Sequence, residues 1–216
     1  MNISLNWLKQ YIDIQESPET VSALLTGCGL EVESMEPFES VKGGLRGLVV
    51  GHVLETSRHP NADRLTVCKV DLGSGQISQI VCGAPNVAAG QKVIVAVPGT
   101  IIHPAKGEPF EIKKAKIRGQ ASEGMICAED EIGMGSSHAG IMILKNDVRV
   151  GSEAADYFKP YTDWIIEIGL TPNRMEAMSH WGVARDVCAY LSYHDKKDMR
   201  PKLPNANSYE LVNAEI

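Results

Sequence analysis

Two short stretches of this sequence hold most of the side chains that could do chemistry. Residues 58–69 are a helix-hostile turn and the alternating strand pattern after it, with Arg58, His59, Asn61, Asp63, Arg64 and Lys69. Residues 112–125 contribute Lys114, Lys116, Arg118, Ser122 and Met125. Such groups suit a catalytic site, a metal site or contact with phosphates. Plain turn chemistry, in which Asn and Asp bond their own backbone, uses the same residue types.

Catalysis and metal binding find little support in the motifs. Cys82 and Ser122 are the candidate nucleophiles, and neither lies in a G-x-S-x-G turn. The histidines form no H-x-x-x-H pair, and the acids of "AEDEIG" (128–133) are typical of a solvated turn face. "GMGSSHAG" (133–140) fails as a dinucleotide loop because its third glycine is misplaced. We therefore identify no catalytic residue and no metal ligand.

Charge favours one region for contact with phosphates. The chain of 216 residues has a net charge of −6, which argues against a general polyanion binder. Residues 41–150 hold 13 Lys and Arg against 10 Asp and Glu, or +3, so the rest of the chain carries −9. Only the middle of the chain is therefore biased toward phosphates, and only mildly.

Cysteine usage and hydropathy indicate a cytoplasmic protein. The five cysteines are an odd number and include no C-x-x-C, so free thiols are expected rather than a disulfide framework or a zinc ribbon. The longest apolar runs are too short to cross a bilayer, and the first residues lack the pattern of a signal peptide. No membrane partner is expected.

The two ends of the chain have an α+β pattern. Residues 1–36 predict helix, helix and strand, with Ser4 and Ser17 as N-caps and Pro18 at a first helical position. After residue 151, "YTDWIIEIGLTPN" predicts a strand and "SHWGVARDVCAYLSYH" an amphipathic helix.

The middle of the chain has a β pattern. Short strands separated by turn signals are predicted in "LVVGHVLET", "LTVCKVDLG", "SQIVCGAP", "QKVIVAVPG", "FEIKKAKIRG" and "GIMILKND". Five or six strands at this spacing predict a five-stranded barrel of the oligonucleotide-binding type. The fold class is thus α+β with an inserted all-β domain. Residues 1–40 and 152–200 are expected to form the host, 41–151 the barrel, and 201–216 a linker and the start of a truncated following domain.

A barrel groove of this kind commonly holds single-stranded or loop RNA. If 110–119 is one strand, Ile112, Lys114 and Lys116 share one face, while Lys113 and its alternates share the other. Splitting the basic groups weakens a simple basic stripe, and lysines on an edge strand serve solubility equally well. The middle segment holds one aromatic residue, Phe110, which favours recognition of backbone and shape over base stacking. A protein-interaction module is the main rival to RNA binding.

Several motifs together resemble a known family. "HPNADRLTVCKVD", "IVCGAPNV", "VPG", "IRGQASEGMICAEDEIG" and "GIMIL" are similar, in order, to the tRNA-binding module of the oligonucleotide-binding fold. The flanks "MNISLNWLKQYID", "LTGCGLEVE" and "EIGLTPNRMEAMSHWGVARDVCAYL" resemble the β subunits of bacterial phenylalanyl-tRNA synthetases. The host domain of that family is winged-helix-like. The resemblance covers essentially the whole chain.

The resemblance implies a function and a set of contact residues. It implies an architectural, tRNA-binding piece of an enzyme that joins phenylalanine to tRNA with ATP and Mg²⁺ as an α2β2 heterotetramer. The α subunit and later β domains would hold the catalytic and editing sites, so residues 1–216 would be non-catalytic and hold no cofactor. The tRNA-binding residues it implies are Arg58, His59, Asn61, Asp63, Arg64, Lys69, Lys114, Lys116, Arg118, Ser122 and Met125.

Two rival interpretations and one departure from the family remain. The chain would alternatively be an assembly module without tRNA contact, or a free-standing tRNA-binding protein, which the flanking α+β segments disfavour. The family's "NRPD" reads "NRME" here, with Met175 and Glu176 in place of Pro and Asp. Ser122 is expected to cap a short helix that carries Met125.

Overall fold

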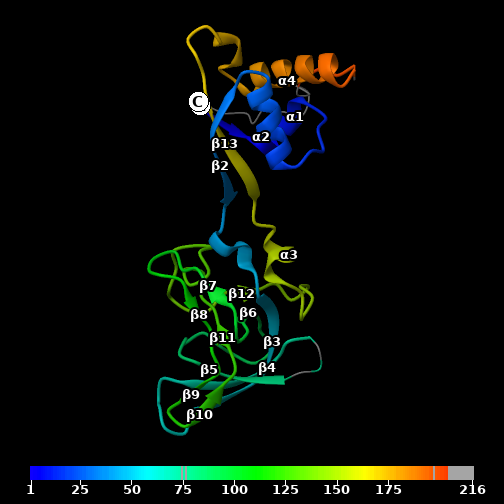
Figure 1. Ribbon diagram of the computed structural model, residues 1–216. Helices are drawn as coiled ribbons and strands as arrows, with labels where there is room; N and C mark the ends of the chain where they lie inside the picture. The colour runs from blue at the N-terminus through cyan, green and yellow to red at the C-terminus, as the bar shows by residue number, and fades with distance from the viewer. Residues whose placement is uncertain (74, 76, 197, 204–216) are drawn as a thin grey trace, which may run out of the picture. The chain divides into compact units, whose positions relative to one another are not determined.

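The chain folds into two compact units. The computed structural model describes residues 1–73, 75, 77–196 and 198–203 (Figure 1). The first unit combines residues 1–38 with the described residues from 162 onward, and the second comprises residues 39–161. Most of the predicted linker and following domain, 201–216, lies outside the described residues.

The first unit is a small three-stranded sheet with helices. Its elements are β1 (Asn2–Ser4), α1 (Leu5–Tyr11), α2 (Pro18–Gly27), β2 (Glu31–Glu39), β13 (Thr162–Gly169), η2 (Met175–Ala177) and α4 (His180–His194). The strand order is β1-β13-β2, and Ile3 pairs with Ile166 across antiparallel strands. The predicted N-caps Ser4 and Ser17 are confirmed, because each hydroxyl accepts a backbone N–H three residues ahead. β1 was not predicted, since three residues are too few to show alternation.

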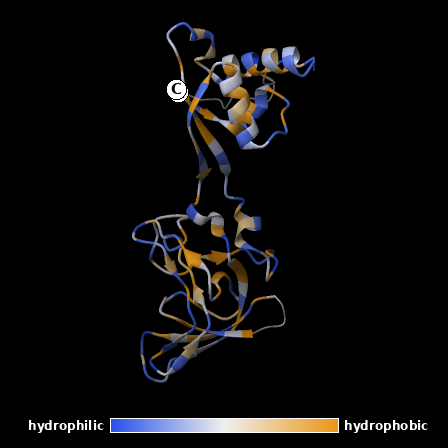
Figure 2. Ribbon diagram, in the orientation of Figure 1, coloured by the Kyte–Doolittle hydropathy of each residue, from blue (hydrophilic) through white to orange (hydrophobic). Residues whose placement is uncertain are grey.

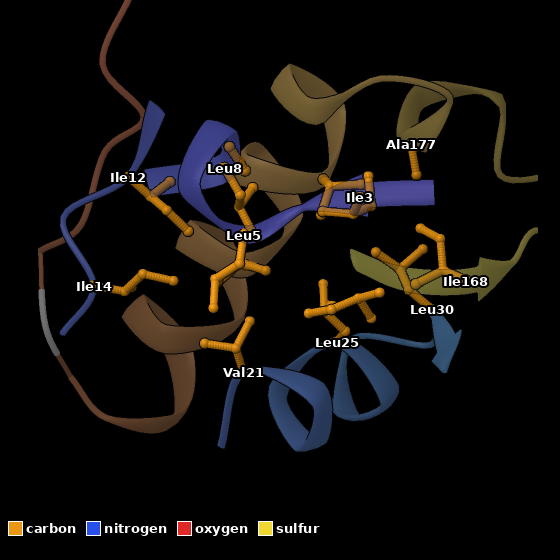
Figure 3. Packing of buried hydrophobic residues seen from close by; sticks show 14 of the residues in the cluster. Ile3, Leu5, Leu8, Ile12, Ile14, Val21, Leu25, Leu30, Ile168 and Ala177 are labelled. Atoms are coloured by element: carbon orange, nitrogen blue, oxygen red, sulfur yellow. The ribbon is translucent and has the colours of Figure 1, made fainter. Parts of the chain in front are cut away.

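The core of this unit joins residues from both ends of the sequence. Figure 3 shows Ile3, Leu8, Leu25 and Ile168 turned toward one another, although more than 140 residues separate Leu25 from Ile168. All four side chains are fully buried or nearly so. Since each fully buried aliphatic side chain contributes about 1.5–3 kcal/mol, this cluster holds the two ends of the host together.

The second unit is built around a nearly closed five-stranded antiparallel barrel, as predicted. Its strands are β3 (Leu48–Arg58), β4 (Thr66–Asp71), β5 (Ile77–Cys82), β6 (Lys92–Ala96) and β11 (Met125–Ile126), in the order β11-β6-β3-β4-β5. A register shift between Val53 and Glu55 lets β3 pair with β6 along its first half and with β4 along its second. The free edge of β5 is closed by residues 122–123: Glu123 N–H donates to the Gln79 carbonyl, and Val81 N–H to the Ser122 hydroxyl.

Smaller elements complete the second unit. They are η1 (Lys42–Leu45), β7 (Ile101–Ile102), β8 (Phe110–Glu111), β9 (Ala115–Ile117), β10 (Gln120–Ser122), β12 (Ile143–Leu144) and α3 (Ala154–Phe158). In Figure 2 the barrel strands carry long hydrophobic stretches, consistent with two buried clusters that share the faces of β3 and β6.

Three details differ from the sequence-based expectations. Residues 110–119 form two short strands rather than one, so the predicted face shared by Ile112, Lys114 and Lys116 is wrong. Ser122 lies in β10 and caps no helix. Residues 152–161, expected in the host, belong to the second unit because Ser152 and Ala154 bond to or pack against β3 and the barrel core.

None of the helices in the described part of the chain is both long and apolar enough to span a membrane.

Candidate nucleic-acid interface

The polar turn after β3 is held by a buried histidine. His59 is only 5 % exposed, and its backbone N–H donates to the Leu65 carbonyl to close the turn. Its ring Nδ1 accepts from the Asn61 backbone N–H at 3.1 Å, so the neutral ring carries its proton on Nε2. Nε2 then donates to the Ile117 carbonyl at 3.0 Å, which belongs to β9. His59 is thus a positioning residue inside the joint rather than a surface ligand.

A tight hairpin meets this turn from the other segment. β9 and β10 pair in antiparallel register, and their two-residue turn is Arg118–Gly119, with φ of 46° and 97°. Two positive φ values in a two-residue loop match the twist of a β-hairpin. Asn61 Nδ2 donates to the Arg118 carbonyl at 3.1 Å. Figure 1 draws the two loops side by side at one end of the barrel.

We call residues 58–65 and 116–119 together the joined loops. Through His59 and Asn61, the structure brings together the two segments that the sequence singled out separately. Both hydrogen bonds end on backbone carbonyls of the hairpin. The arrangement therefore fixes the backbone from which the basic side chains project.

The exposed cations of the two segments fall into two groups. Arg58, Arg64, Lys116 and Arg118 are exposed, and none has an ion-pair partner among the described residues. Lys69 is paired with Glu55 at 2.8 Å and Lys114 with Glu123 at 2.9 Å. The first group is therefore available to phosphates, whereas the second must give up a carboxylate to reach one.

A polar groove starts at the joined loops and crosses the outer face of β3, β4 and β5. It encloses about 230 Å³ and is lined by Thr56, Ser57, Arg58, Lys69, Gln79 and Gln120, among others. Gln79 Nε2 donates to the Ala121 carbonyl at 2.8 Å, which ties the groove floor to β10. Hydroxyls, amides and cations are the groups that hold sugar and phosphate oxygens in nucleic-acid complexes.

Three of the predicted contact residues have other surroundings. Ser122 is 3 % exposed, and its hydroxyl accepts from Val81 N–H and donates to the Gly124 carbonyl, so it closes the barrel. Met125 is half-buried and packs on the barrel core. Asp63 is exposed and has no hydrogen bond or ion pair within the described part of the chain.

Sequence reasoning missed the two glutamines of the groove. Gln79 and Gln120 are neutral amides in a strand pattern, so neither charge nor a turn signal distinguished them. The alternation of Gln79 with its neighbours in β5 is the signal that would have placed its side chain outward, since Ser78 and Ile80 are buried.

In the first unit, Glu176, which stands in place of the Asp of the family motif, belongs to a polar network around Arg174. Arg174 Nε donates to Glu176 and Nη2 to Asp186, each at 2.5 Å, while Nη1 reaches the Cys28 and Gly29 carbonyls at 3.1 and 3.2 Å. The Glu176 partner raises the pKa of Arg174 and, conversely, Arg174 lowers the pKa of Glu176. Glu176 therefore pairs with Arg174 and helps to tie the end of α2 to α4.

The cysteines have the chemistry of packed side chains. All five are free thiols, and four are buried. Burial raises the pKa of Cys68 to about 12 and that of Cys28 to about 11, so little thiolate forms near neutral pH. No three His, Cys, Asp or Glu side chains within the described ranges gather as metal ligands.

The second unit has almost no net charge. The second unit holds 14 Lys and Arg against 13 Asp and Glu, whereas the remainder of the chain holds 7 against 14. A unit with a charge of +1 has almost no long-range attraction for phosphates, and counterions screen what there is within about 8 Å at physiological salt. Any affinity for a polyanion must therefore come from the cations without a partner.

Comparison of the chain with known proteins identifies similar families and relatives. A family model described as "Putative tRNA binding domain" matches residues 48–153. The chain is 50% identical over 216 residues to a phenylalanine–tRNA ligase β subunit of Bacteroides fragilis, which covers all of the chain and 26% of that protein. It is 50% identical over 210 residues to that of Porphyromonas gingivalis, covering 96% of the chain and 25% of that protein.

The solved structures add a weaker likeness. The C-terminal domain of Plasmodium vivax p43 aligns with 48% of this chain and 56% of its own at 25% identity, with a TM-score of 0.35. The sequence relatives carry the assignment, and the chain spans about a quarter of their length. By similarity along its whole length, this chain belongs to the family of bacterial phenylalanine–tRNA ligase β subunits, and it contains that family's tRNA-binding domain.

Proposed function

We propose that the chain is the tRNA-contacting and architectural part of a phenylalanine–tRNA ligase β subunit, and that it contacts tRNA through the joined loops. The observation that carries this proposal is the convergence of two separate polar segments, locked by His59 and Asn61. It places four cations without a described partner at one end of the domain that matches the tRNA-binding family. Phosphate contacts of this kind position RNA without reading its sequence.

The whole protein's activity belongs to the same proposal. The name of the relatives, β subunit, implies a partner subunit, and we propose that this is the α subunit of an α2β2 enzyme. That enzyme would attach phenylalanine to its tRNA in the cytoplasm. ATP and Mg²⁺ would serve a catalytic site that we place outside these 216 residues. Within the chain, the task that remains is to bind and orient tRNA.

Binding of tRNA by the purified chain tests the proposal. One variant replaces Arg58, Arg64, Lys116 and Arg118 with Ala. The control replaces Lys42, Lys106, Lys145 and Arg149, four exposed cations of the second unit outside the joined loops that also lack a described ion pair. Both variants change the net charge by the same amount. At low salt, fluorescence anisotropy should show tRNA binding by wild type and the control and clear loss in the joined-loop variant. Equal affinities of the two variants would refute the proposal.

An assembly module is the second candidate function. Trp7, Met175, Met178 and Tyr193 of the first unit are at least half exposed, and exposed large apolar side chains are typical of surfaces that pack against another chain. The acidic balance of the chain outside the second unit also disfavours RNA there. This candidate predicts that the isolated chain does not bind tRNA at any salt concentration. The first unit likewise disfavours a free-standing tRNA-binding protein, which would need no such host.

A further inference from the structure

A larger cavity of the second unit lies apart from the polar groove. It encloses about 650 Å³, within the usual range of small-molecule sites. Its apolar walls come from Val81, Ile112, Ile117, Met125, Ile126 and Ile141. It lies between the loop after β5, the β8–β9 segment and residues 128–141, so it is distinct from the groove over β3, β4 and β5.

Two carboxylates line the cavity: Glu111, which pairs with Lys113, and Glu131, which gives the cavity a polar end. Glu131 is half-buried and lines the cavity, and its Oε2 accepts from the Ala128 backbone N–H at 2.7 Å. Its Oε1 has no hydrogen-bond partner among the described residues. Cys82 lines the same region, and burial, with a contribution from Glu131, raises the pKa of its thiol. The cavity therefore offers a hydrogen-bond acceptor, fixed in place by the backbone, beside an apolar wall.

Two basic side chains line the cavity as well, and each pairs with a carboxylate. Lys113 is exposed and pairs with Glu111 at 3.3 Å, and His138 pairs with Asp130 at 3.0 Å. The hydrogen bond and charge of Asp130 raise the pKa of His138, which favours its charged form. An occupant with an amino group at one end would meet Glu131, and an anionic group at its other end would take the place of Glu111 and Asp130 beside Lys113 and His138.

The β9–β10 hairpin contributes residues both to the cavity and to the joined loops. Ile117 lines the cavity, while its own carbonyl accepts from His59 in the joint. Its neighbours Lys116 and Arg118 are the exposed cations of the proposed phosphate contact. The residue that lines the cavity, Ile117, therefore lies between two of the cations that would hold an RNA strand at the joined loops.

We propose that this cavity takes one unstacked nucleotide whose base carries an exocyclic amino group, cytosine or adenine. Glu131 Oε1 accepts the amino proton, the apolar walls contact the base faces, and the phosphate lies toward Lys113 and His138. Proteins commonly read single-stranded RNA by placing splayed-out bases in such pockets, and carboxylates select amino groups. The inference rests on the proposed tRNA contact, to which it adds a base preference that phosphate contacts do not supply.

Titration with CMP and UMP tests the pocket directly, because the two differ at the base edge and share the phosphate. The probe is the ¹³C-methyl NMR signal of Met125, assigned with a Met125→Leu variant. Uracil carries a carbonyl oxygen at the position where cytosine carries its amino group, so at that position only CMP can donate a hydrogen bond to Glu131 Oε1. CMP should therefore bind about tenfold more tightly than UMP. Equal shifts of Met125 by CMP and UMP, or none with either, would overturn the pocket.

A Glu131→Gln variant sharpens the test. The Gln oxygen would still accept the hydrogen bond from the Ala128 N–H, so the NH₂ group would face the cavity. It would favour the carbonyl that uracil carries where cytosine has its amino group. The preference should therefore reverse toward UMP, and an unchanged preference for CMP would contradict the role of Glu131. tRNA should also shift Met125. If it leaves Met125 unmoved while CMP shifts it, the occupant is a free nucleotide and the inference fails.

These outcomes separate the pocket from the proposed function. A chain that binds tRNA through the joined loops but does not distinguish CMP from UMP overturns the pocket alone. A chain that prefers CMP but does not bind tRNA overturns the proposed function, and with it the tRNA base as the occupant, and leaves a site for a free nucleotide.

Discussion

The joint between the two loops should depend on His59 more than on any of its exposed neighbours. A His59→Ala substitution removes two hydrogen bonds, to Asn61 N–H and to the Ile117 carbonyl, and the packing of a ring that is 5 % exposed. At about 1 kcal/mol for each net hydrogen bond, plus the cost of leaving partly buried groups unpaired, the second unit should lose about 2–4 kcal/mol. Asn61→Ala removes one exposed bond and should cost about 0.5–1 kcal/mol.

The positions of the tryptophans make this loss measurable. Trp7, Trp164 and Trp181 all belong to the first unit. Urea unfolding followed by Trp fluorescence therefore reports the first unit, while far-UV circular dichroism also reports the barrel. His59→Ala should move only the circular dichroism transition to lower urea. Asp63→Ala is the matched control from the same turn, with an expected change below about 0.5 kcal/mol. Equal barrel transitions for His59→Ala and Asp63→Ala would refute the role given to His59.

Three further predictions concern the host, its pH response and the barrel closure. Arg174→Met should destabilise the first unit by about 2–3 kcal/mol, because it removes charge-assisted hydrogen bonds to Asp186 and to two carbonyls. The control Arg185→Met should leave this stability unchanged, and urea unfolding followed by Trp fluorescence compares the two variants. Burial lowers the pKa of His180, whose Nε2 accepts from Ser4 N–H, so the unfolded chain binds the proton more readily. The stability of the first unit should therefore fall as pH drops below about 6.5, and His180→Gln should flatten this dependence in urea titrations at each pH. Ser122→Ala should lower barrel stability by about 1–3 kcal/mol in circular dichroism without changing the Kd for tRNA, since the hydroxyl is buried in the closure; a weaker Kd in the folded variant would contradict this.

Local patterns predicted the elements of this fold well. Ser17 before Pro18 located the start of α2, and alternation located the barrel strands β3, β4, β5 and β6, because burial of one face imposes a period of two. The fifth strand, β11, was missed: Met125 was expected on a short helix, and two residues are too few to show alternation. The break within 110–119 was not visible. Lys113 and Lys114 fit an alternating pattern, yet the chain between β8 and β9 makes no ladder with a neighbouring strand.

The candidate site was predictable in its residues but not in its geometry. The family resemblance placed His59 and Asn61 among the tRNA-binding residues, whereas the structure uses both to bond carbonyls 57–58 residues away. Such long-range contacts leave no local signal, because any polar turn residue can bond its own backbone or a distant one. The same reason hid Gln79 and Gln120 in the groove, and the closing role of Ser122 across 41 residues.

The salt dependence of tRNA binding tests the central claim most directly. The joined loops should act as one phosphate-contacting edge, so the logarithm of the association constant should fall linearly with the logarithm of salt from 50 to 300 mM. Replacing Arg58, Arg64, Lys116 and Arg118 should reduce the slope by roughly one for each phosphate that these cations neutralise, and the four-cation control should keep the wild-type slope. A joined-loop variant that binds tRNA with the wild-type slope would contradict the account.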